Sequence, residues 1–282
     1  MQVVFSIIIP TYNRAYIIWK TIKGVQEQIY PYWELLIIDD GSTDDTQKVV
    51  AEYQKDPRIK YVKLPHAGSQ TARNEGLKRA KGSIIAFVDS DDYIYDNFLS
   101  VSLEHFQKNP KKIFATSNYN RRLEQFDKNY KLVDFIKSSC VQKPTVSLED
   151  FYLRNVEPCG TGIFLKRSVV KNGIKWDTKT KIFQDWDFIL QLGRKYPNGY
   201  MHIPLVLFEY CRRFGIDGIT SKATYLDWAN GFEVIYQKHK EDPLMRGQTW
   251  YPGQVDKYKA LQKESYSGKS ISPMYEYFFT EK

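Results

Sequence analysis

Short apolar segments alternate with segments of helical periodicity throughout the first 118 residues of this chain. The apolar segments lie at residues 3–9, 35–38, 59–64 and 83–88, and they are rich in β-branched side chains. Strands this apolar are usually buried on both faces, as in a parallel sheet covered by helices. The alternation therefore predicts an α/β fold with a doubly wound, mostly parallel sheet.

Three intervening segments have the spacing of helices, at residues 14–28, 43–53 and 68–80. Ser42 or Thr43 is placed to cap the second of them. In doubly wound sheets, ligands bind beyond the carboxyl ends of the strands. The loops that follow the strands are therefore the expected site.

After residue 118 the periodic pattern weakens. Residues 119–145 are polar, basic and irregular. We predict a short strand at 160–166, a helix at 185–195 and another strand at 201–208. From residue 220 onward we expect helices and then a polar tail.

The domain organisation follows from these patterns, since the sequence shows neither an internal repeat nor a linker rich in Gly, Ser or Pro. We predict one α/β domain over residues 1–215, with halves at 1–118 and 119–215. A C-terminal helical extension is predicted at 216–282.

The composition is that of a folded protein with a sizeable core, because 42% of the 282 residues are hydrophobic. No segment approaches the ~18 consecutive apolar residues of a membrane span, and we expect no signal peptide. The three cysteines and four histidines are scattered, so neither a disulfide framework nor a zinc site is expected. The expected location is the cytoplasm.

The net charge of +8 is unevenly distributed. Residues 108–143 hold nine Lys or Arg against three Asp or Glu, and residues 166–181 hold six against Asp177 alone. A solvated basic surface, a polyanionic partner, a phosphate-bearing acceptor and an anionic membrane surface all fit this pattern. No nucleic-acid recognition motif accompanies the charge, so no nucleic-acid partner is expected.

An acidic cluster, Asp89-Ser90-Asp91-Asp92, directly follows the fourth apolar segment. A carboxylate cluster at a strand end must be neutralised, and a hard divalent cation such as Mg²⁺ or Mn²⁺ prefers oxygen ligands. Such a cation shares its shell with water and substrate phosphates. The alternative is that Asp91 or Asp92 caps a helix that starts near Tyr95.

A second polar loop, Asp39-Asp40-Gly41-Ser42, follows the second apolar segment. Asp and Gly suit turns, so a structural role is one interpretation. A carboxylate here could instead accept a hydrogen bond from the N3–H of a uracil ring. Arg73, in the third predicted helix, could reach a pyrophosphate or lie on the surface.

Four motifs, taken together and in this order, resemble family 2 glycosyltransferases of the GT-A fold. They are Ser6-Ile7-Ile8-Ile9-Pro10-Thr11-Tyr12-Asn13-Arg14, Asp39-Asp40-Gly41-Ser42-Thr43-Asp44, Ala72-Arg73-Asn74-Glu75-Gly76 and Asp89-Ser90-Asp91-Asp92. The resemblance covers roughly the first 100 residues and implies an inverting transferase. The implied donor is a nucleotide-diphosphate sugar, with a UDP-sugar favoured, and the implied metal is Mn²⁺ or Mg²⁺. Residues 1–118 would be the nucleotide-sugar half and 119–215 the acceptor half.

The resemblance also assigns roles to individual residues. The nucleotide sugar would be bound by Pro10, Thr11, Tyr12, Arg14, Asp40, Arg73, Asp89 and Ser90. Asp91 would hold the metal, with Asp92 as its substitute.

Family members carry an acidic catalytic base downstream, commonly the Asp of a Glu-Asp pair that starts a helix. Here the pair is Gln184-Asp185, so Asp185 matches the base while Gln184 departs from the usual Glu. The alternative is that Asp185 only caps the helix. By the same resemblance, Cys159-Gly160-Thr161-Gly162 faces the acceptor. Arg212, Arg213 and Thr220 lie where relatives place a loop that closes over the diphosphate.

The expected function is metal-dependent, inverting transfer of a hexosyl or N-acetylhexosaminyl group to a hydroxyl of a glycan or lipid-diphosphate-linked acceptor. The Gln-x-x-Arg-Trp element of processive synthases is absent, which favours a single addition. Peripheral contact with an anionic membrane is a hypothesis motivated by the basic segments. The alternatives are a nucleotidyltransferase, which usually has a Gly-rich loop that this chain lacks, and an inactive nucleotide- or glycan-binding protein.

Overall fold

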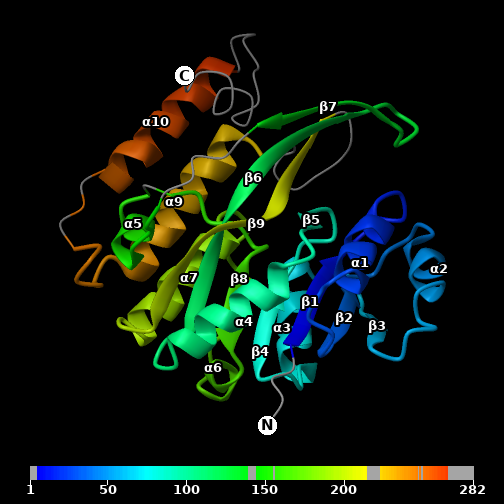
Figure 1. Ribbon diagram of the computed structural model, residues 1–282. Coiled ribbons are helices and arrows are strands. Elements are labelled where there is room, and N and C mark those ends of the chain that lie inside the picture. Colours follow the sequence, from blue (N-terminus) through cyan, green and yellow to red (C-terminus); the bar gives the residue numbers. More distant parts are fainter. Residues whose placement is uncertain are drawn as a thin grey trace.

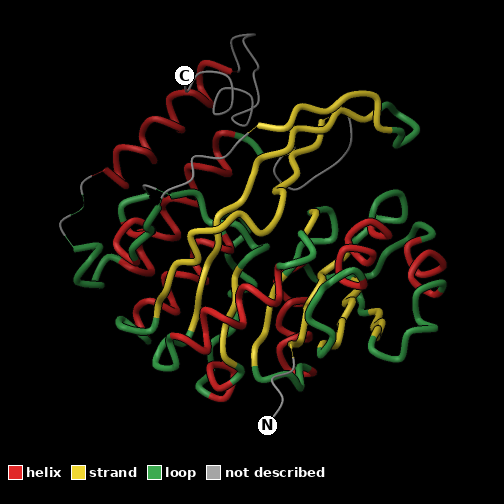
Figure 2. Tube along the Cα trace, viewed as in Figure 1, coloured by secondary structure: helices red, strands yellow, loops and turns green. Residues whose placement is uncertain are grey.

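The computed structural model describes residues 5–138, 144–154, 156–214, 223–246, 248 and 250–265. One sheet crosses the molecule, with helices on both of its sides (Figures 1 and 2). Within the described residues the sheet has nine strands in the order β3-β2-β1-β4-β8-β6-β9-β5, and β7 pairs with β6. This arrangement confirms the predicted α/β class.

The elements of the first half are β1 (Phe5–Thr11), α1 (Ile18–Gln26), β2 (Trp33–Asp39), α2 (Thr46–Ala51), β3 (Ile59–Lys63), α3 (Ser69–Arg79), β4 (Ile84–Phe87), β5 (Tyr93–Ile94) and α4 (Phe98–Lys108). Those of the second half are β6 (Phe114–Phe126), β7 (Leu132–Ser138), α5 (Leu148–Tyr152), β8 (Ile163–Lys166), α6 (Ser168–Lys171), α7 (Gln184–Lys195), β9 (Tyr200–Phe214), α9 (Tyr225–His239) and α10 (Trp250–Ser265).

The first four strands form the parallel part of the sheet. β1 pairs with β2 and with β4, and β2 pairs with β3, all in parallel. Side chains alternate along β1: Ile7 and Ile9 enter the core beneath α1 and α4, whereas Ile8 enters the core beneath α3 and α7. Because both of their faces are covered, β1 and β4 are almost entirely apolar, whereas the edge strand β3 is partly exposed and carries Lys60 and Lys63.

The rest of the sheet is mixed. β4–β8, β8–β6, β6–β7 and β9–β5 are antiparallel, and β6–β9 is parallel. The sheet is therefore parallel over its first four strands and mixed beyond them.

The segment at 119–145, which we interpreted as irregular, contains the outer half of β6 and all of β7. It lacks strand-like alternation because its charges are buried in cross-strand pairs. Glu124 of β6 lies opposite Arg213 of β9 in the parallel register, and their side chains are 2.9 Å apart. Hydrophobic periodicity does not detect a strand that is stabilised by buried ion pairs.

A glycine lets α3 approach the sheet closely. A Cβ atom at Gly76 would lie only 2.4 Å from Cγ2 of Ile8 in β1. Arg73 precedes Gly76 by about one helical turn, so this contact also fixes how far Arg73 stands above the sheet.

The C-terminal helices α9 and α10 pack on α7. Trp186 of α7 is fully buried against Phe232 of α9 and Tyr251 of α10, with ring centroids 5.9 and 5.4 Å away. Residues 215–222 lie outside the described residues, so the division after residue 215 remains a prediction. In the ranges that the structure describes, no helix has the length and apolar character needed to cross a membrane.

Candidate active site

The loops that follow β1, β2 and β4 meet at one edge of the sheet, as predicted. The amide of Asp40 donates to the carbonyl of Thr11 at 2.8 Å. Asn13 joins the first two loops, because its amide donates to Ser42 Oγ at 2.8 Å and its side-chain oxygen accepts from the amide of Thr43 at 2.8 Å. Asn13 adopts a left-handed backbone (φ 50°), which Asn tolerates better than most residues.

Asp40 organises the next loop rather than facing solvent. Its carboxylate accepts from the amides of Ala67 at 2.7 Å and Gly68 at 2.9 Å, and it pairs with His66 Nδ1 at 2.9 Å. Only 2% of Asp40 is exposed. The ring of His66 stacks on that of Tyr12 at 4.4 Å, so an aromatic pair lies directly beside Asp40. Nothing in the sequence indicated a role for His66.

Thr11 and Pro10 close the end of β1. Thr11 is buried, and its hydroxyl has no hydrogen-bond partner among the described residues. Such an orphaned buried group is expected to find a partner in a ligand or in water. Pro10 pairs with Ile38 of β2 but lies beyond the end of β4, where its missing N–H breaks no ladder bond.

Asp39, at the end of β2, directs its carboxylate into the interior. Asp39 is fully buried, and it accepts from the amide of Ser42 at 2.7 Å and from the hydroxyl of Tyr61. α2 begins at Thr46, with Asp45 at its N-cap position, so neither Ser42 nor Thr43 caps it.

Arg73 connects the donor loops with the helix of the predicted base. Its guanidinium donates to Asp89 at 2.6 Å, to Gln184 at 3.0 Å and to Ser69 at 3.2 Å. It also lies 4.5 Å over the ring of Trp176. Gln184, which departs from the family pattern, thus keeps the hydrogen bond that a Glu could accept but not its charge.

Gly160 allows the chain to approach this pair. A Cβ atom there would lie 3.0 Å from Asp89 Oδ2 and 3.2 Å from Arg73 Nη2. The following residue, Thr161, accepts from the amide of Asp89 at 2.8 Å. The segment that resembles the family's acceptor-facing element therefore lies against the acidic loop.

Asp91 presents an accessible carboxylate, with 26% of its side chain exposed. It is flanked by Arg14 Nε at 3.6 Å and Arg213 Nη1 at 3.2 Å. Arg213 also binds Glu124, which is completely buried. Arg213, from the far half of the chain, therefore positions Asp91, while Thr220 lies outside the described residues.

Asp92 points into the interior. Its two oxygens accept from the amide of Cys211 at 2.9 Å and from the hydroxyl of Thr161. Only 1% of it is exposed, and burial together with Asp91 and Asp89 raises its pKa well above the ordinary value. Both oxygens of Asp92 are thus engaged by protein donors in the interior, whereas Asp91 faces the edge.

The acidic loop does not cap the helix that follows it. Ser90 is buried, and α4 begins at Phe98 with Asn97 at its N-cap position. The alternative in which Asp91 or Asp92 caps this helix is therefore wrong, because β5 intervenes.

The side chains at this edge fit a partly protein-bound cation. In the described ranges, no cluster of three or more His, Cys, Asp or Glu side chains is placed to hold a metal. Mg²⁺ and related cations in phosphate sites need only one or two protein carboxylates, since water and phosphate oxygens fill the other positions. Asp91 supplies one such carboxylate.

Asp185 lies in the first turn of α7, two residues after the N-cap position. That position is held by Phe183 with a left-handed backbone (φ 62°) and no side-chain cap, so Asp185 is not the cap. Burial raises the pKa of Asp185 to about 6, with Arg73 acting against this shift and Asp89 adding to it. A carboxylate with such a pKa accepts a proton more readily than an ordinary Asp.

Asp187 has a different role, although it is only two residues away. It is buried and accepts from His239 at 2.9 Å, and its carboxylate lies 2.6 Å from Lys238 Nζ. Burial alone raises the pKa of Asp187, but the hydrogen bonds from His239 and Lys238 bring it below the ordinary value. Asp187 therefore ties α7 to α9.

A buried charged cluster joins three segments of the second half, around Glu157. Glu157 binds Arg121 at 2.7 Å and Arg212 at 3.0 Å, and the Arg212 guanidinium lies 4.5 Å over the ring of Tyr210. The cysteines nearby, Cys159 and Cys211, are buried free thiols, whereas Cys140 lies outside the described residues. No feature of the sequence indicated that these charges from three segments would meet.

Comparisons with known proteins agree with this geometry. The family model described as Glycosyl transferase family 2 matches residues 6–172, more than half of the chain. WcaA of Escherichia coli strain K12 is 30% identical over 249 residues, which span 84% of this chain and 81% of WcaA.

Two further relatives match shorter segments. WfaP of Escherichia coli, a UDP-Glc:alpha-D-GlcNAc-diphosphoundecaprenol beta-1,3-glucosyltransferase, is 35% identical over 168 residues, 59% of this chain and 62% of WfaP. An uncharacterized glycosyltransferase of Rickettsia conorii is 43% identical over 116 residues, 41% of this chain and 19% of that protein. The chain thus spans less than two thirds of the length of either relative.

Solved structures share the fold. Residues 1–349 of Staphylococcus aureus TarS superpose with a TM-score of 0.66 at 20% identity, covering 95% of this chain and 75% of that one. The mannosyltransferase PcManGT from Pyrobaculum calidifontis, in complex with GDP-Man and Mn²⁺, gives 0.64 at 17% identity, covering 96% and 77%. With the GT-A architecture and the matched family model in agreement, the chain belongs to glycosyl transferase family 2.

Proposed function

We propose that this protein is a metal-dependent, inverting glycosyltransferase that moves a sugar from a UDP-sugar to a hydroxyl of a glycan or lipid-diphosphate-linked acceptor. One observation carries the proposal. Arg73 lies between Asp89 of the acidic loop and Gln184 at the start of α7, so the donor loops and Asp185 adjoin one another. A nucleotide sugar bound by the donor loops would therefore have Asp185 beside it as a proton acceptor.

The uridine would lie at the ends of β1 and β2. Tyr12 and His66 offer a stacked aromatic surface, and Thr11 offers a hydroxyl without a partner among the described residues. Asp40 would contact the base after giving up one of its loop hydrogen bonds. A UDP donor is favoured because WfaP is named for UDP-Glc and a TarS structure contains UDP-GlcNAc.

The diphosphate would lie between Asp91 and Arg73. Arg14 and Arg213, both beside Asp91, would share the phosphate charge with Arg73. A bound Mn²⁺ or Mg²⁺ held by Asp91 would stabilise the charge that builds on the leaving diphosphate. The Mn²⁺ in the PcManGT complex supports this choice of cofactor.

Asp185 would act as general base. It takes the proton of the acceptor hydroxyl as that oxygen attacks the anomeric carbon from the face opposite the diphosphate. The bond to the diphosphate breaks as the new glycosidic bond forms, so the configuration inverts. The pKa of about 6 leaves Asp185 largely ionised at neutral pH, yet more basic than an exposed Asp.

The acceptor would enter from the side of Gly160, Tyr210 and the Glu157 cluster. WfaP is named for transfer to a GlcNAc-diphospho-lipid, which makes this class of acceptor the first to test. Transfer to such an acceptor would bring the protein to a membrane surface, which agrees with the hypothesis of peripheral contact. By this proposal, residues 1–118 bind the donor and residues 119–215 the acceptor.

The test is a transfer assay. The full chain is incubated with Mn²⁺, a panel of UDP-sugars and a synthetic α-GlcNAc-diphospho-lipid, and the product mass is measured. We expect a mass gain of one hexose or N-acetylhexosamine that Asp185→Asn removes and the surface variant Asp45→Asn retains. Equal product from Asp185→Asn and the unmodified chain would disprove the base assignment.

A further inference from the structure

A basic cavity of about 620 Å³ lies away from the edge that holds Asp91 and Asp185. It is lined by the last turns of α7 and α9 and by the loop before α7. On α7, its lining begins at Gln191, six residues after Asp185. This is roughly 9 Å along the helix axis, at about 1.5 Å per residue. The cavity is therefore separate from the proposed active site but shares a helix with it.

The cavity carries an excess of positive charge. Five of its lining side chains are cationic, namely Lys175, Lys179, Arg194, Lys195 and Lys238. Lys238 is neutralised between Asp177 at 2.7 Å and Asp187 at 2.6 Å. Five cations against these two carboxylates leave +3. The C-terminal ends of α7 and α9 each contribute about −0.5, so about +2 remains.

Helix dipoles explain only part of this charge. Arg194 and Lys195 lie in the last turn of α7, where cations are ordinarily favourable. Lys175 and Lys179 belong to a loop, and no such effect brings them to the same cavity. Within the described residues, none of these four cations forms an ion pair with a carboxylate. Their mutual repulsion favours a bound anion.

The wall of the cavity is fixed by hydrogen bonds and stacking. The backbone of Trp176 donates to and accepts from the Asn74 side chain, each at 2.8 Å, and its ring stacks on Phe188 at 4.2 Å. On the opposite element, His239 is buried against Asp187, and its Nδ1 has no partner in the part of the chain that the structure describes. Trp176 and His239 therefore form a fixed part of the lining, beside which the exposed cations lie.

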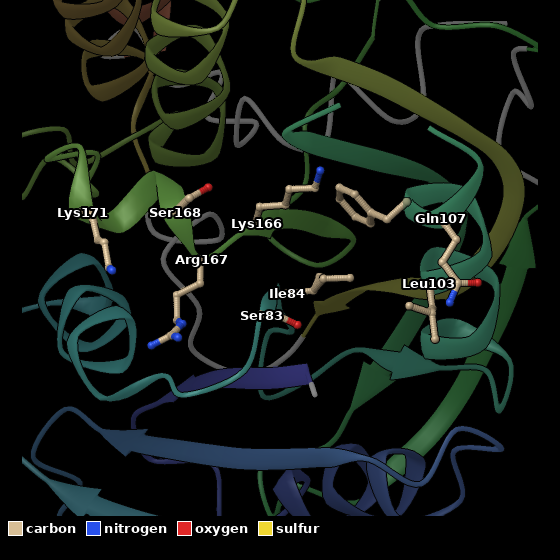
Figure 3. Close-up of a pocket in the computed structure, with 9 residues that line it drawn as sticks. Ser83, Ile84, Leu103, Gln107, Lys166, Arg167, Ser168 and Lys171 are labelled. Carbon is tan, nitrogen blue, oxygen red and sulfur yellow. The ribbon is translucent and has the colours of Figure 1, made fainter. Parts of the chain in front are cut away.

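A second basic cavity offers a comparison with the first. It encloses about 470 Å³ near the start of β4, and its cations are Lys166, Arg167 and Lys171 (Figure 3). The Lys166 ammonium donates to the carbonyl of Pro110, and in Figure 3 it points away from the Arg167 guanidinium. With three lining cations against five, this cavity serves as a control of lower charge.

We propose that the cavity between α7 and α9 binds a phosphate-type oxyanion, carried either by free phosphate or by a sugar phosphate. Four cations that pair with no carboxylate of the described residues line the cavity, and one of them, Lys195, donates to the carbonyl of Asn172. Trp176 also contacts Arg73 of the proposed donor site at 4.5 Å, so the two sites share one aromatic residue. The proposal does not depend on sugar transfer and can fail or succeed independently of it.

The test is calorimetric titration of the full chain with inorganic pyrophosphate in the absence of divalent metal. We expect one saturable binding event that persists when excess UDP fills the proposed donor site. Lys175→Gln combined with Lys179→Gln should weaken it roughly tenfold or more, because two nearby charges are lost. Arg167→Gln combined with Lys171→Gln removes the same charge from the other cavity and should leave affinity within about twofold. Unchanged melting temperatures would show that both double variants are folded.

Three results would overturn the proposal. They are the absence of saturable binding, equal weakening by both double variants, and loss of pyrophosphate binding in excess UDP without metal. Absence of saturable binding would mean that the cavity holds no anion site. Equal weakening by both double variants would indicate diffuse surface charge. Loss of binding in excess UDP would place the anion in the proposed donor site. Replacing pyrophosphate by glucose 1-phosphate identifies the source. Tighter binding of the sugar phosphate indicates a glycan-borne phosphate, and weaker binding indicates a free one, and either supports the cavity.

Discussion

At the scale of single residues, Asp185 makes the pH dependence of the reaction testable. Its pKa of about 6 means that it is protonated, and unable to accept a proton, below pH 6. We therefore expect kcat to rise with pH up to about 6 and to level off above it. Asp185→Asn should lower kcat by roughly 10²-fold or more and remove this pH dependence. A wild-type profile that is flat between pH 5 and 7 would contradict the base assignment.

Gln184 offers a second test of the same environment. Gln184→Glu places a carboxylate next to Asp185 and lets it pair with Arg73, which otherwise opposes the rise in the pKa of Asp185. Both effects disfavour the ionised form of Asp185, so the midpoint of the pH profile should move upward. The exposed variant Gln54→Glu adds the same charge elsewhere and should leave the midpoint in place. An unchanged or lowered midpoint in Gln184→Glu would contradict this account of the surroundings of Asp185.

At the scale of elements, the contact of α3 with β1 depends on Gly76. In Gly76→Ala the new methyl group would overlap Ile8 of β1, so the variant should lose about 1–3 kcal/mol of unfolding free energy. Gly253 lies in α10, where an added methyl group would meet no atom of the described residues within 4 Å. Gly253→Ala should therefore be neutral or stabilising by up to about 1 kcal/mol. Urea unfolding measures both, and equal stability of the two variants would mean that α3 can move away from β1 at little cost.

The cross-strand pair of β6 and β9 is the second prediction at this scale. Glu124 is fully buried against Arg213 and Arg122, and removing one partner of a buried pair leaves an uncompensated charge. Glu124→Ala should therefore cost about 3–5 kcal/mol of unfolding free energy. Glu104→Ala removes an exposed pair with Lys108 and should change stability far less. If both variants unfold at the same urea concentration, β6 and β9 do not depend on their buried charges.

The sequence predicted elements well where burial is apolar and poorly where it is ionic. Each predicted strand of the first half is present, with bounds that differ by a few residues. β7 was missed although four of its seven residues are apolar, whereas the outer part of β6 was missed because polar and charged residues dominate it. For the same reason, the sequence did not predict the cluster in which Glu157 binds Arg121 and Arg212, since the three residues come from separate segments. No local pattern reports a pairing that only the tertiary fold creates.

The candidate site divides in the same way. The order of strands predicted that Thr11, Asp40 and Asp89 lie at one edge, since parallel strands end there together. The family resemblance predicted Arg73 at the same edge. The orientation of each side chain could not be predicted. Asp91 and Asp92 are adjacent in the sequence, yet one faces the edge and the other binds the amide of Cys211 in the interior. Likewise, Asp185 and Asp187 share a helix but serve different sites.

At the scale of the whole molecule, both halves of the chain contribute to each of the two hydrophobic cores. A single cluster of buried residues runs from Ile8 and Leu36 of the parallel sheet, through Trp186 of α7, to Tyr258 of α10. The helices that follow the predicted boundary at residue 215 therefore support the helix that carries Asp185. The loops after β1, β2 and β4, the helix that carries Asp185 and the C-terminal helices form one structural unit, which explains how distant segments can hold Arg73 between Asp89 and Gln184.

The most direct test of the metal-bridged nucleotide site is calorimetric titration of the full chain with UDP, with Mn²⁺ and then with a chelator. We predict that Mn²⁺ tightens UDP binding by roughly tenfold or more, as expected for a cation that bridges a carboxylate and a diphosphate. Asp91→Asn should abolish this difference, and Asp45→Asn should preserve it. UDP binding that is equal with and without Mn²⁺, and equal in Asp91→Asn, would contradict a nucleotide site bridged by metal to Asp91.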